Sequence, residues 1–255
     1  MRILLSNDDG IHAPGLRHLR EALRGFGDLH VVAPNAEQSA VGHAITLFDP
    51  LKVKEVTKDG EFIGHAVVGT PADCVKLAVG DLLPGPPDLV VSGINLGPNT
   101  GISCLYSGTV SAASEGTILG FPSVAFSLCT FTDPHWDTAI RVARGVTRRL
   151  LDLGLPPDTV LSVNIPNRPW SEIRGLRPAR MGRSRFIERF EKREDPRGNA
   201  YYWMDGDLEY LDTDRDSDVA LVEEGWVTLT PIGLDLTRHS ALDHAADLAR
   251  IGDST

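Results

Sequence analysis

Two adjacent aspartates, Asp8 and Asp9, follow the apolar run Ile3-Leu4-Leu5 and precede Gly10. A short apolar run that ends at a turn signal is typical of a strand buried on both faces of a parallel sheet. The two carboxylates then lie at the carboxyl end of that strand, where open α/β sheets bind their ligands. Because neighbouring anions repel each other, the pair needs a cation or strong hydrogen bonding. Taken alone, the pair also fits a helix cap beside a solvated turn.

Two further strand ends carry oxygen-bearing side chains. Ser39 lies in the polar segment 35–40 after a second apolar run, and Asn95 follows the apolar run Leu89-Val90-Val91. The carboxyl ends of parallel strands share one edge of a sheet, so we expect these groups to converge on Asp8 and Asp9. Carboxylate, hydroxyl and amide oxygens favour Mg²⁺, Mn²⁺ or Ca²⁺ over zinc or copper. The spacing therefore predicts a catalytic cation site with open positions for water.

The segment Ser107-Gly108-Thr109 leads into a predicted helix. Gly108 allows close backbone approach, and the free N–H groups of a helix start attract an anion. The hydroxyls of Ser107 and Thr109 are further donors. An ordinary Ser/Thr helix cap is the alternative, and Asn99 is either a phosphate ligand or a turn residue. Beside a cation site, we expect this segment to bind phosphate.

The elements that position these residues follow an alternating pattern. A helix from Pro14 to about Gly25 separates the first strand from a second at 30–34, which predicts a parallel βαβ unit. The further elements expected up to residue 166 are strands within 44–68 around a turn at Asp59-Gly60, a helix that starts at Thr70-Pro71, a strand at 88–92, a helix from 107 to about 120, a strand at 122–126, a helix at 136–153 and a strand at 160–165 that closes the layer. The fold class is therefore α/β, a doubly wound, largely parallel, Rossmann-like sheet over residues 1–166.

Residues 167–255 are expected to form an extension of this core. Residues 172–197 contain nine arginines and lysines and five acidic residues, and aromatic residues stand at Phe190 and at 201–203. These features indicate either a basic arm for polyanions or a projecting hairpin that pairs with another subunit, and we favour the hairpin. A returning strand at 226–230 and an amphipathic helix at 240–251 follow, and we expect them to pack on the core or on a neighbouring subunit.

The composition argues against several classes of function. With 255 residues and a formal charge of −10, the chain is not suited to binding nucleic-acid polymers or anionic membranes through bulk charge. Three scattered cysteines and no long apolar stretch indicate a cytoplasmic, soluble protein. The sequence has no G-x-G-x-x-G after the first strand, no P-loop, no G-x-S-x-G and no H-E-x-x-H.

Three segments together resemble the SurE (survival protein E) family: Asn7-Asp8-Asp9-Gly10, residues 92–99 (SGINLGPN) and residues 106–110 (YSGTV). Residues 69–75 (GTPADCV) and 235–240 (DLTRHS) resemble this family too, with the same order and spacing over nearly the whole chain. The resemblance implies a metal-dependent phosphatase, a 5′-nucleotidase or acid phosphatase. Its expected substrates are nucleoside 5′- and 3′-monophosphates, with short-chain polyphosphate as a further one.

The resemblance also assigns the site and its partners. It implies one divalent cation per subunit, Mg²⁺ or Mn²⁺, held by Asp8, Asp9, Ser39 and Asn95, with Asp8 and Asp9 as the catalytic pair. It places Asn99, Ser107, Gly108 and Thr109 in the phosphate site. It further implies a homodimer or homotetramer with exchanged C-terminal arms, in agreement with the hairpin hypothesis. The identities of the nucleophile and the general base stay open.

One departure and one competing hypothesis accompany this interpretation. The family's second loop often reads basic-Ser-Gly, whereas this chain has Gln38-Ser39-Ala40, which lacks that positive charge near the substrate. Adjacent acids after a first strand also occur in phospho-receiver sensors, which bind Mg²⁺ without turnover. That fold is far shorter and needs a further acid and a lysine at later strand ends, where this chain offers Asn95.

Overall fold

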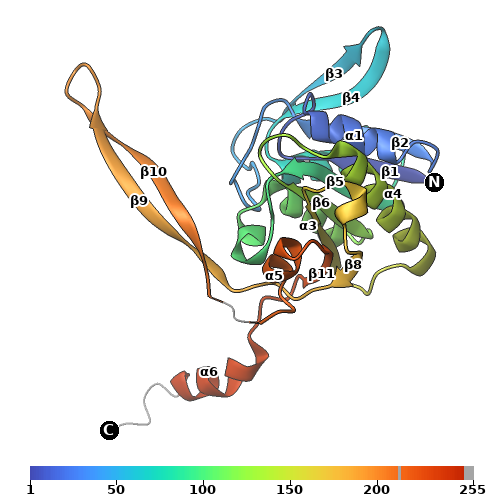
Figure 1. Ribbon diagram of the computed structural model, residues 1–255. Helices are drawn as coiled ribbons and strands as arrows, with labels where there is room; N and C mark the ends of the chain where they lie inside the picture. Colours follow the sequence, from blue (N-terminus) through green and yellow to red (C-terminus); the bar gives the residue numbers. More distant parts are fainter. Residues whose placement is uncertain (212–213, 250–255) are drawn as a thin grey trace.

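The computed structural model describes residues 1–211 and 214–249. A central mixed sheet of nine strands, counted over these residues, organises the chain (Figure 1). Its strands, in spatial order, are β3 (Lys52–Lys58), β4 (Glu61–Val68), β2 (Asp28–Pro34), β1 (Arg2–Ser6), β5 (Leu89–Leu96), β6 (Ser123–Cys129), β7 (Thr159–Pro166), β11 (Val227–Gly233) and β8 (Leu176–Pro178). The strands from β4 to β7 in this order are all parallel, and β3 runs antiparallel to β4. The predicted α/β class with a largely parallel sheet is confirmed.

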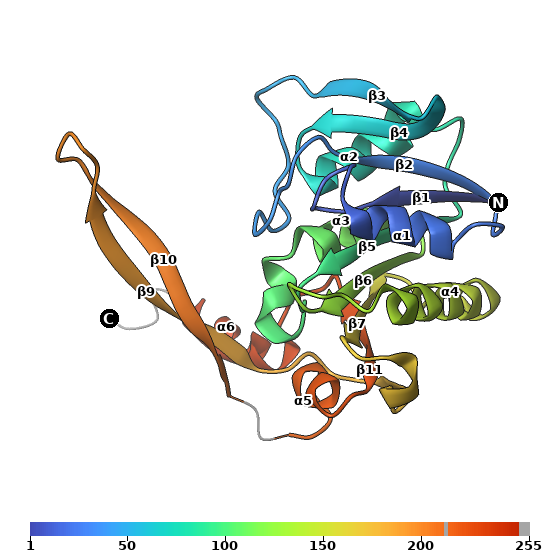
Figure 2. The same cartoon turned by 45° about the horizontal axis from the view of Figure 1, so that its top comes forward.

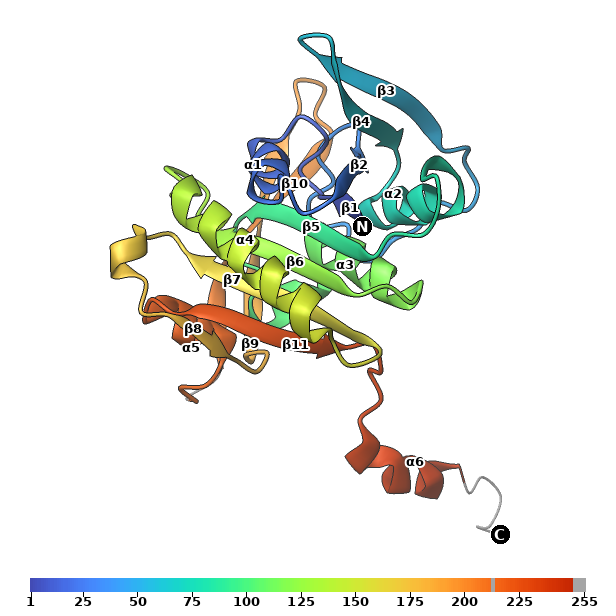
Figure 3. The same ribbon diagram turned by 90° about the vertical axis from the view of Figure 1, so that its right-hand side faces the viewer.

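Helices cover both faces of the sheet. They are α1 (Pro14–Ala22), α2 (Pro71–Leu77), α3 (Gly108–Ile118) and α4 (Trp136–Leu153), and a π-helical turn η1 (Ala78–Leu82) continues α2. In β1, Ile3 and Leu5 join the core beneath α1 and α4, whereas Leu4 joins the core beneath α2 and α3. Because successive side chains of a strand point to opposite faces, this division explains why the run is apolar throughout. Figure 3 shows α4 lying across one face of the sheet.

The helix starts follow their local sequence signals. Thr70 caps α2, and a reciprocal capping box joins its side chain to Asp73, as the Thr70-Pro71 pair predicts. Ser107 caps α3 by accepting a hydrogen bond from the Val110 N–H at 3.1 Å. The predicted bounds of α4 agree with the structure at both ends.

Two expectations about the sheet are wrong. The strand expected to end at Ser92 continues to Leu96, because an extra residue between Ser92 and Asn95 is accommodated as a bulge against β6 and pairing resumes at Asn95. The layer expected to close at β7 continues through β11, which pairs antiparallel with β7, and then through β8. Edge pairing of this kind depends on a chain segment more than 60 residues downstream, which local sequence does not reveal.

The rest of the chain extends away from the sheet. Strands β9 (Ser184–Glu194) and β10 (Ala200–Tyr210) form the predicted hairpin, which projects from the core (Figure 2). A short helix α5 (Asp218–Glu223) precedes β11. The last helix, α6 (Leu242–Leu248), starts two residues later than expected, because a 3₁₀ turn, η4 (His239–Ala241), precedes it. Its predicted end at Ile251 lies outside the described residues. The division into a core and an extension at residue 166 stays a prediction.

None of the described helices is long and apolar enough to cross a bilayer.

Candidate functional site

Asp8 is held between the end of β1 and the start of α3. Its side chain is buried, with 5% of its surface exposed, and its Oδ1 accepts a hydrogen bond from the hydroxyl of Thr109. Gly108 lies against it so closely that a Cβ there would come within 2.6 Å of the Asp8 Cβ. Glycine is therefore required at this position for the helix to approach the carboxylate.

The site carries excess negative charge. Burial raises the pKa of Asp8 above its ordinary value, against the lowering effect of the Thr109 hydrogen bonds. Burial, followed by the charges of Asp8 and Glu37, raises the pKa of Asp9 to about 7. Within the described residues, no lysine or arginine forms an ion pair with either aspartate. Asp8 and Asp9 therefore form a pair of acids that a cation would stabilise.

The loop after β2 brings Ser39 to this pair. The N–H of Gln38 donates to the carbonyl of Asp8 at 2.8 Å, and the hydroxyl of Ser39 donates to Glu37 Oε1 at 2.6 Å. On the other side, the Asn95 Nδ2 donates to the carbonyl of Gly97 at 2.9 Å, so the Asn95 Oδ1 remains available as an oxygen ligand.

Asn99 is fixed by partners from two further strands. Its Nδ2 donates to the hydroxyl of Ser127 at 2.8 Å, and its backbone N–H donates to Asn164 Oδ1 at 2.8 Å. The Asn164 Nδ2 returns a bond to the Asn99 carbonyl at 3.1 Å. These bonds hold the loop after β5 in one conformation and leave the Asn99 side-chain oxygen without a hydrogen-bond donor among the described residues.

Five of the eight predicted residues line one cavity of about 210 Å³: Asp8, Ser39, Asn95, Asn99 and Ser107. Asp9, Gly108 and Thr109 are not part of this lining, although Gly108 and Thr109 contact Asp8 from α3. The described residues contain no group of three or more histidine, cysteine, aspartate and glutamate side chains suited to a metal. Two carboxylates with a hydroxyl and an amide are instead a sparse, all-oxygen donor set. This set fits a hard cation such as Mg²⁺ or Mn²⁺ that retains water ligands.

Phosphate chemistry is favoured on the other wall of the cavity. Ser107 is the N-cap of α3, so its hydroxyl oxygen accepts from the Val110 N–H, and among the described residues its proton has no acceptor. The first turn of an eleven-residue helix adds partial positive charge beside Asp8. The Thr109 hydroxyl, predicted as a phosphate donor, is engaged by Asp8 in the structure. Its place in the phosphate site stays a prediction.

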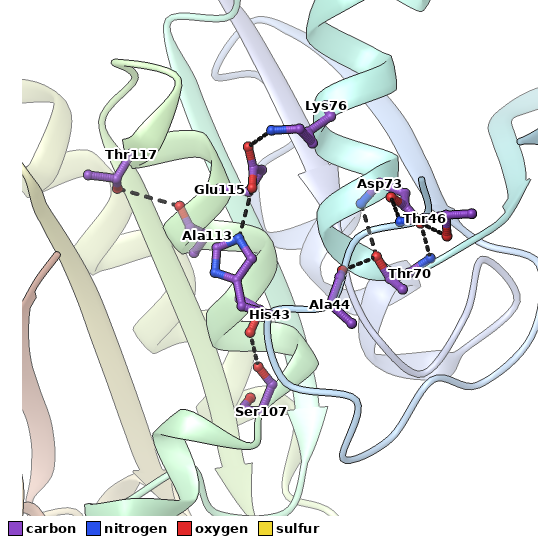
Figure 4. A network of polar contacts seen from close by, with 11 residues as sticks. His43, Ala44, Thr46, Thr70, Asp73, Lys76, Ser107, Ala113, Glu115 and Thr117 are labelled. Atoms are coloured by element: carbon purple, nitrogen blue, oxygen red, sulfur yellow. Dashed lines mark hydrogen bonds and ion pairs between the residues drawn. The ribbon is translucent and has the colours of Figure 1, made fainter. Parts of the chain in front are cut away.

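Two buried acids anchor the loop that carries Ser39 (Figure 4). Glu115 of α3 accepts hydrogen bonds from His43 at 2.8 Å and from Lys76 at 2.7 Å, although its side chain is only 2% exposed. Asp73 of α2 accepts bonds from the N–H of Thr46 at 2.9 Å and from its hydroxyl at 2.6 Å. The segment from His43 to Thr46 is thereby fixed to both helices.

Several residues of the site are absent from the sequence-based predictions. Glu37 could have been predicted as a site residue, because it lies in the same polar loop as Ser39. Asn164 could not have been predicted, because its partner Asn99 lies 65 residues away in the sequence. Tyr106 and Phe131 line the cavity with exposed side chains, and an exposed aromatic residue cannot be told from a buried one by its letter.

Comparisons with known proteins identify relatives over nearly the whole chain. A family model described as "Survival protein SurE" matches residues 3–188. A protein of Syntrophobacter fumaroxidans named 5′-nucleotidase SurE is 46% identical over 95% of this chain and 97% of its own length. A protein of the same name from Heliobacterium modesticaldum is 46% identical over 100% of this chain and 94% of its own.

A solved structure has the same fold. The crystal structure of the SurE protein from Aquifex aeolicus superposes with a TM-score of 0.84 at 41% sequence identity. The match covers 98% of this chain and 100% of that one.

Proposed function

The chain belongs to the SurE family, and we propose on this premise that it is a divalent-metal-dependent phosphomonoesterase of nucleoside monophosphates. The 5′-nucleotidase name that its relatives share makes it a phosphoric monoester hydrolase acting on nucleotides. The observation that carries the proposal is the cavity in which Asp8, Ser39 and Asn95 face the N-terminus of α3. Release of 3′-phosphate and cleavage of short polyphosphate are parts of the same proposal.

We assign cation binding to one wall of the cavity and phosphate binding to the other. Asp8, Asp9, Ser39 and Asn95 are the ligands we propose for the cation. When bound, a divalent cation polarises phosphoryl oxygens and lowers the pKa of a coordinated water. Thr109 orients the Asp8 carboxylate by donating to its Oδ1.

Ser107 and the N-terminus of α3 supply the second half of the site. The Ser107 hydroxyl proton and the backbone N–H groups of the first turn offer hydrogen bonds to the phosphoryl oxygens. Donors fixed in advance stabilise the charge that develops on these oxygens during hydrolysis. Asn99, locked by Ser127 and Asn164, is a further proposed phosphate ligand.

We propose that the protein functions as a homo-oligomer built through the β9–β10 hairpin. Phe190, Tyr202, Trp203 and Met204 are each more than half exposed on this hairpin. Phe190, Tyr202 and Met204 share one face of the hairpin, since Phe190 pairs with Met204, and Trp203 lies on the opposite face. Exposed aromatic and apolar side chains of this kind are typical of a protein–protein interface. Exchange of the C-terminal arms between subunits would cover these side chains. Cytoplasmic localisation stays a prediction.

The test is phosphate release from nucleoside 5′- and 3′-monophosphates and short polyphosphate, each with Mg²⁺, Mn²⁺ or EDTA. We expect turnover that requires the cation and falls at least 100-fold in Asp8→Asn, because a neutral amide replaces a charged ligand. Asp28→Asn is the matched control, an exposed carboxylate at the opposite end of β2. Binding of nucleotide or metal without any phosphate release would instead support the sensor hypothesis.

A further inference from the structure

Two exposed aromatic side chains stand at the rim of the catalytic cavity. Phe131 is 78% exposed and Tyr106 is 62% exposed, yet both belong to the lining that includes Asp8 and Ser107. They come from different elements: Tyr106 immediately precedes the N-cap of α3, and Phe131 lies in the loop after β6. The lining thus combines the polar groups of the proposed site with two exposed aromatic rings.

The position of Phe131 is set by its surroundings. The Thr130 hydroxyl donates to the carbonyl of Thr132 at 2.5 Å and accepts from the Thr132 N–H at 3.2 Å, which closes a tight turn around Phe131. Its ring lies over Gly97, where a Cβ would come within 2.7 Å of the Phe131 Cε1. Gly97 has a φ of +121°, so a side chain is disfavoured there on two grounds. The ring is therefore seated on the turn that links Asn95, near the end of β5, to Asn99.

The size of the cavity determines which part of a nucleotide extends to Phe131 and Tyr106. Pockets that enclose a small molecule measure about 300–1,000 Å³, whereas this cavity measures about 210 Å³. It accommodates a phosphate and part of a sugar, and a base attached to that sugar must project through the mouth. Phe131 and Tyr106 are the large apolar groups that this base meets first.

We propose that Phe131, assisted by Tyr106, is a stacking platform for the nucleobase and determines the preference for nucleotides over other phosphate esters. This inference rests on the proposed phosphomonoesterase function and adds the substrate class to it. Stacking on an aromatic ring tolerates every base, since each has a π-face. The platform therefore favours nucleotides as a class, and purines over pyrimidines through their larger area.

The test compares substrates with and without a base. Phosphate release from AMP, CMP and ribose 5-phosphate is measured for the wild type, Phe131→Ala, Phe131→Trp and Phe48→Ala. Phe48 is the matched control, a 98% exposed phenylalanine outside the cavity lining. Loss of one stacking partner corresponds to roughly 5- to 150-fold in affinity. For Phe131→Ala we expect a KM for AMP about tenfold higher and a much smaller change in the KM for ribose 5-phosphate, which has no base to stack.

Further outcomes separate this proposal from its alternatives. Phe131→Trp should keep or lower the KM for AMP, and calorimetric titration of AMP and ribose 5-phosphate in Mg²⁺ should reproduce the same difference without turnover. An equal loss for AMP and ribose 5-phosphate, or a lower oligomeric mass of Phe131→Ala, would overturn the stacking role while leaving the phosphatase intact. Absence of phosphate release by the wild type would refute the enzyme, and the calorimetric comparison would still decide the platform.

Discussion

Asp73 holds the start of α2 and the Ser39 loop with one carboxylate, so its replacement by asparagine should lower stability measurably. The side chain is 2% exposed and accepts three hydrogen bonds, from the N–H of Thr70 at 2.9 Å and from the N–H and hydroxyl of Thr46 at 2.9 and 2.6 Å. Asparagine retains one acceptor oxygen and directs an NH₂ group at donors. One bond is therefore lost and the others lose their charge assistance.

The magnitude follows from the strength of these bonds. A hydrogen bond to a charged group contributes about 1.5–3 kcal/mol and a neutral one about 1 kcal/mol. One lost bond and two weakened ones, discounted for the water that reaches Thr46, amount to about 3 kcal/mol in the free energy of unfolding. In a chain of this size, that corresponds to a fall in Tm of roughly 6–12 °C.

The stability difference between wild type and Asp73→Asn should also depend on pH in a defined direction. Burial acts to raise the pKa of Asp73, but the hydrogen bonds from Thr46 and Thr70 outweigh it and hold the pKa below the ordinary 3.8. A lowered pKa stabilises the folded state fully above the unfolded pKa, and this stabilisation is lost as the pH falls through the folded one. The difference between wild type and Asp73→Asn should be constant from pH 7 to about 5 and shrink below pH 3.8.

Urea unfolding followed by circular dichroism between pH 7 and pH 3 measures this difference. Asp81→Asn is the control, because Asp81 is an exposed carboxylate on the adjacent turn η1. A loss below about 0.5 kcal/mol at pH 7, within the range of ordinary surface substitutions, would refute the reasoning. A difference that persists undiminished at pH 3 would refute the assignment of the effect to the carboxylate.

Three further predictions concern the site and the assembly. Gly108→Ala should lower kcat at least tenfold and also lower Tm, because its Cβ would come within 2.6 Å of the buried Asp8 Cβ and force α3 away from β1; unchanged kinetics would contradict this. Lys76→Met should lower the free energy of unfolding by about 1 kcal/mol, because the buried Glu115 carboxylate loses one cationic partner. The loss is modest because Lys76 is 44% exposed, and an unaltered Tm would count against this prediction. Trp203→Ser should lower the molar mass measured by light scattering, and an unchanged mass would argue against the hairpin interface.

The sequence alone determined the elements whose signals are local. The run Ile3-Leu4-Leu5 predicts a strand buried on both faces, and the Thr70-Pro71 pair predicts a capped helix; both are present. Helix α4 agrees with its predicted bounds because its apolar face repeats at helical spacing over 18 residues. Asp8, Ser39 and Asn95 were predicted to converge because parallel strands share one edge, and they line one cavity in the structure.

Only the tertiary structure decided which groups those residues meet. The hydroxyl of Thr109 donates to Asp8 across 101 positions, and Asn99 is locked by Asn164 across 65. The pairing of β11 with β7 and the seating of Phe131 over Gly97 are likewise contacts between distant segments. Local spacing constrains a residue's dihedral angles and the face on which it lies. The partner of a buried polar group is instead selected by how whole elements pack, because many distant residues of the same type compete for that role.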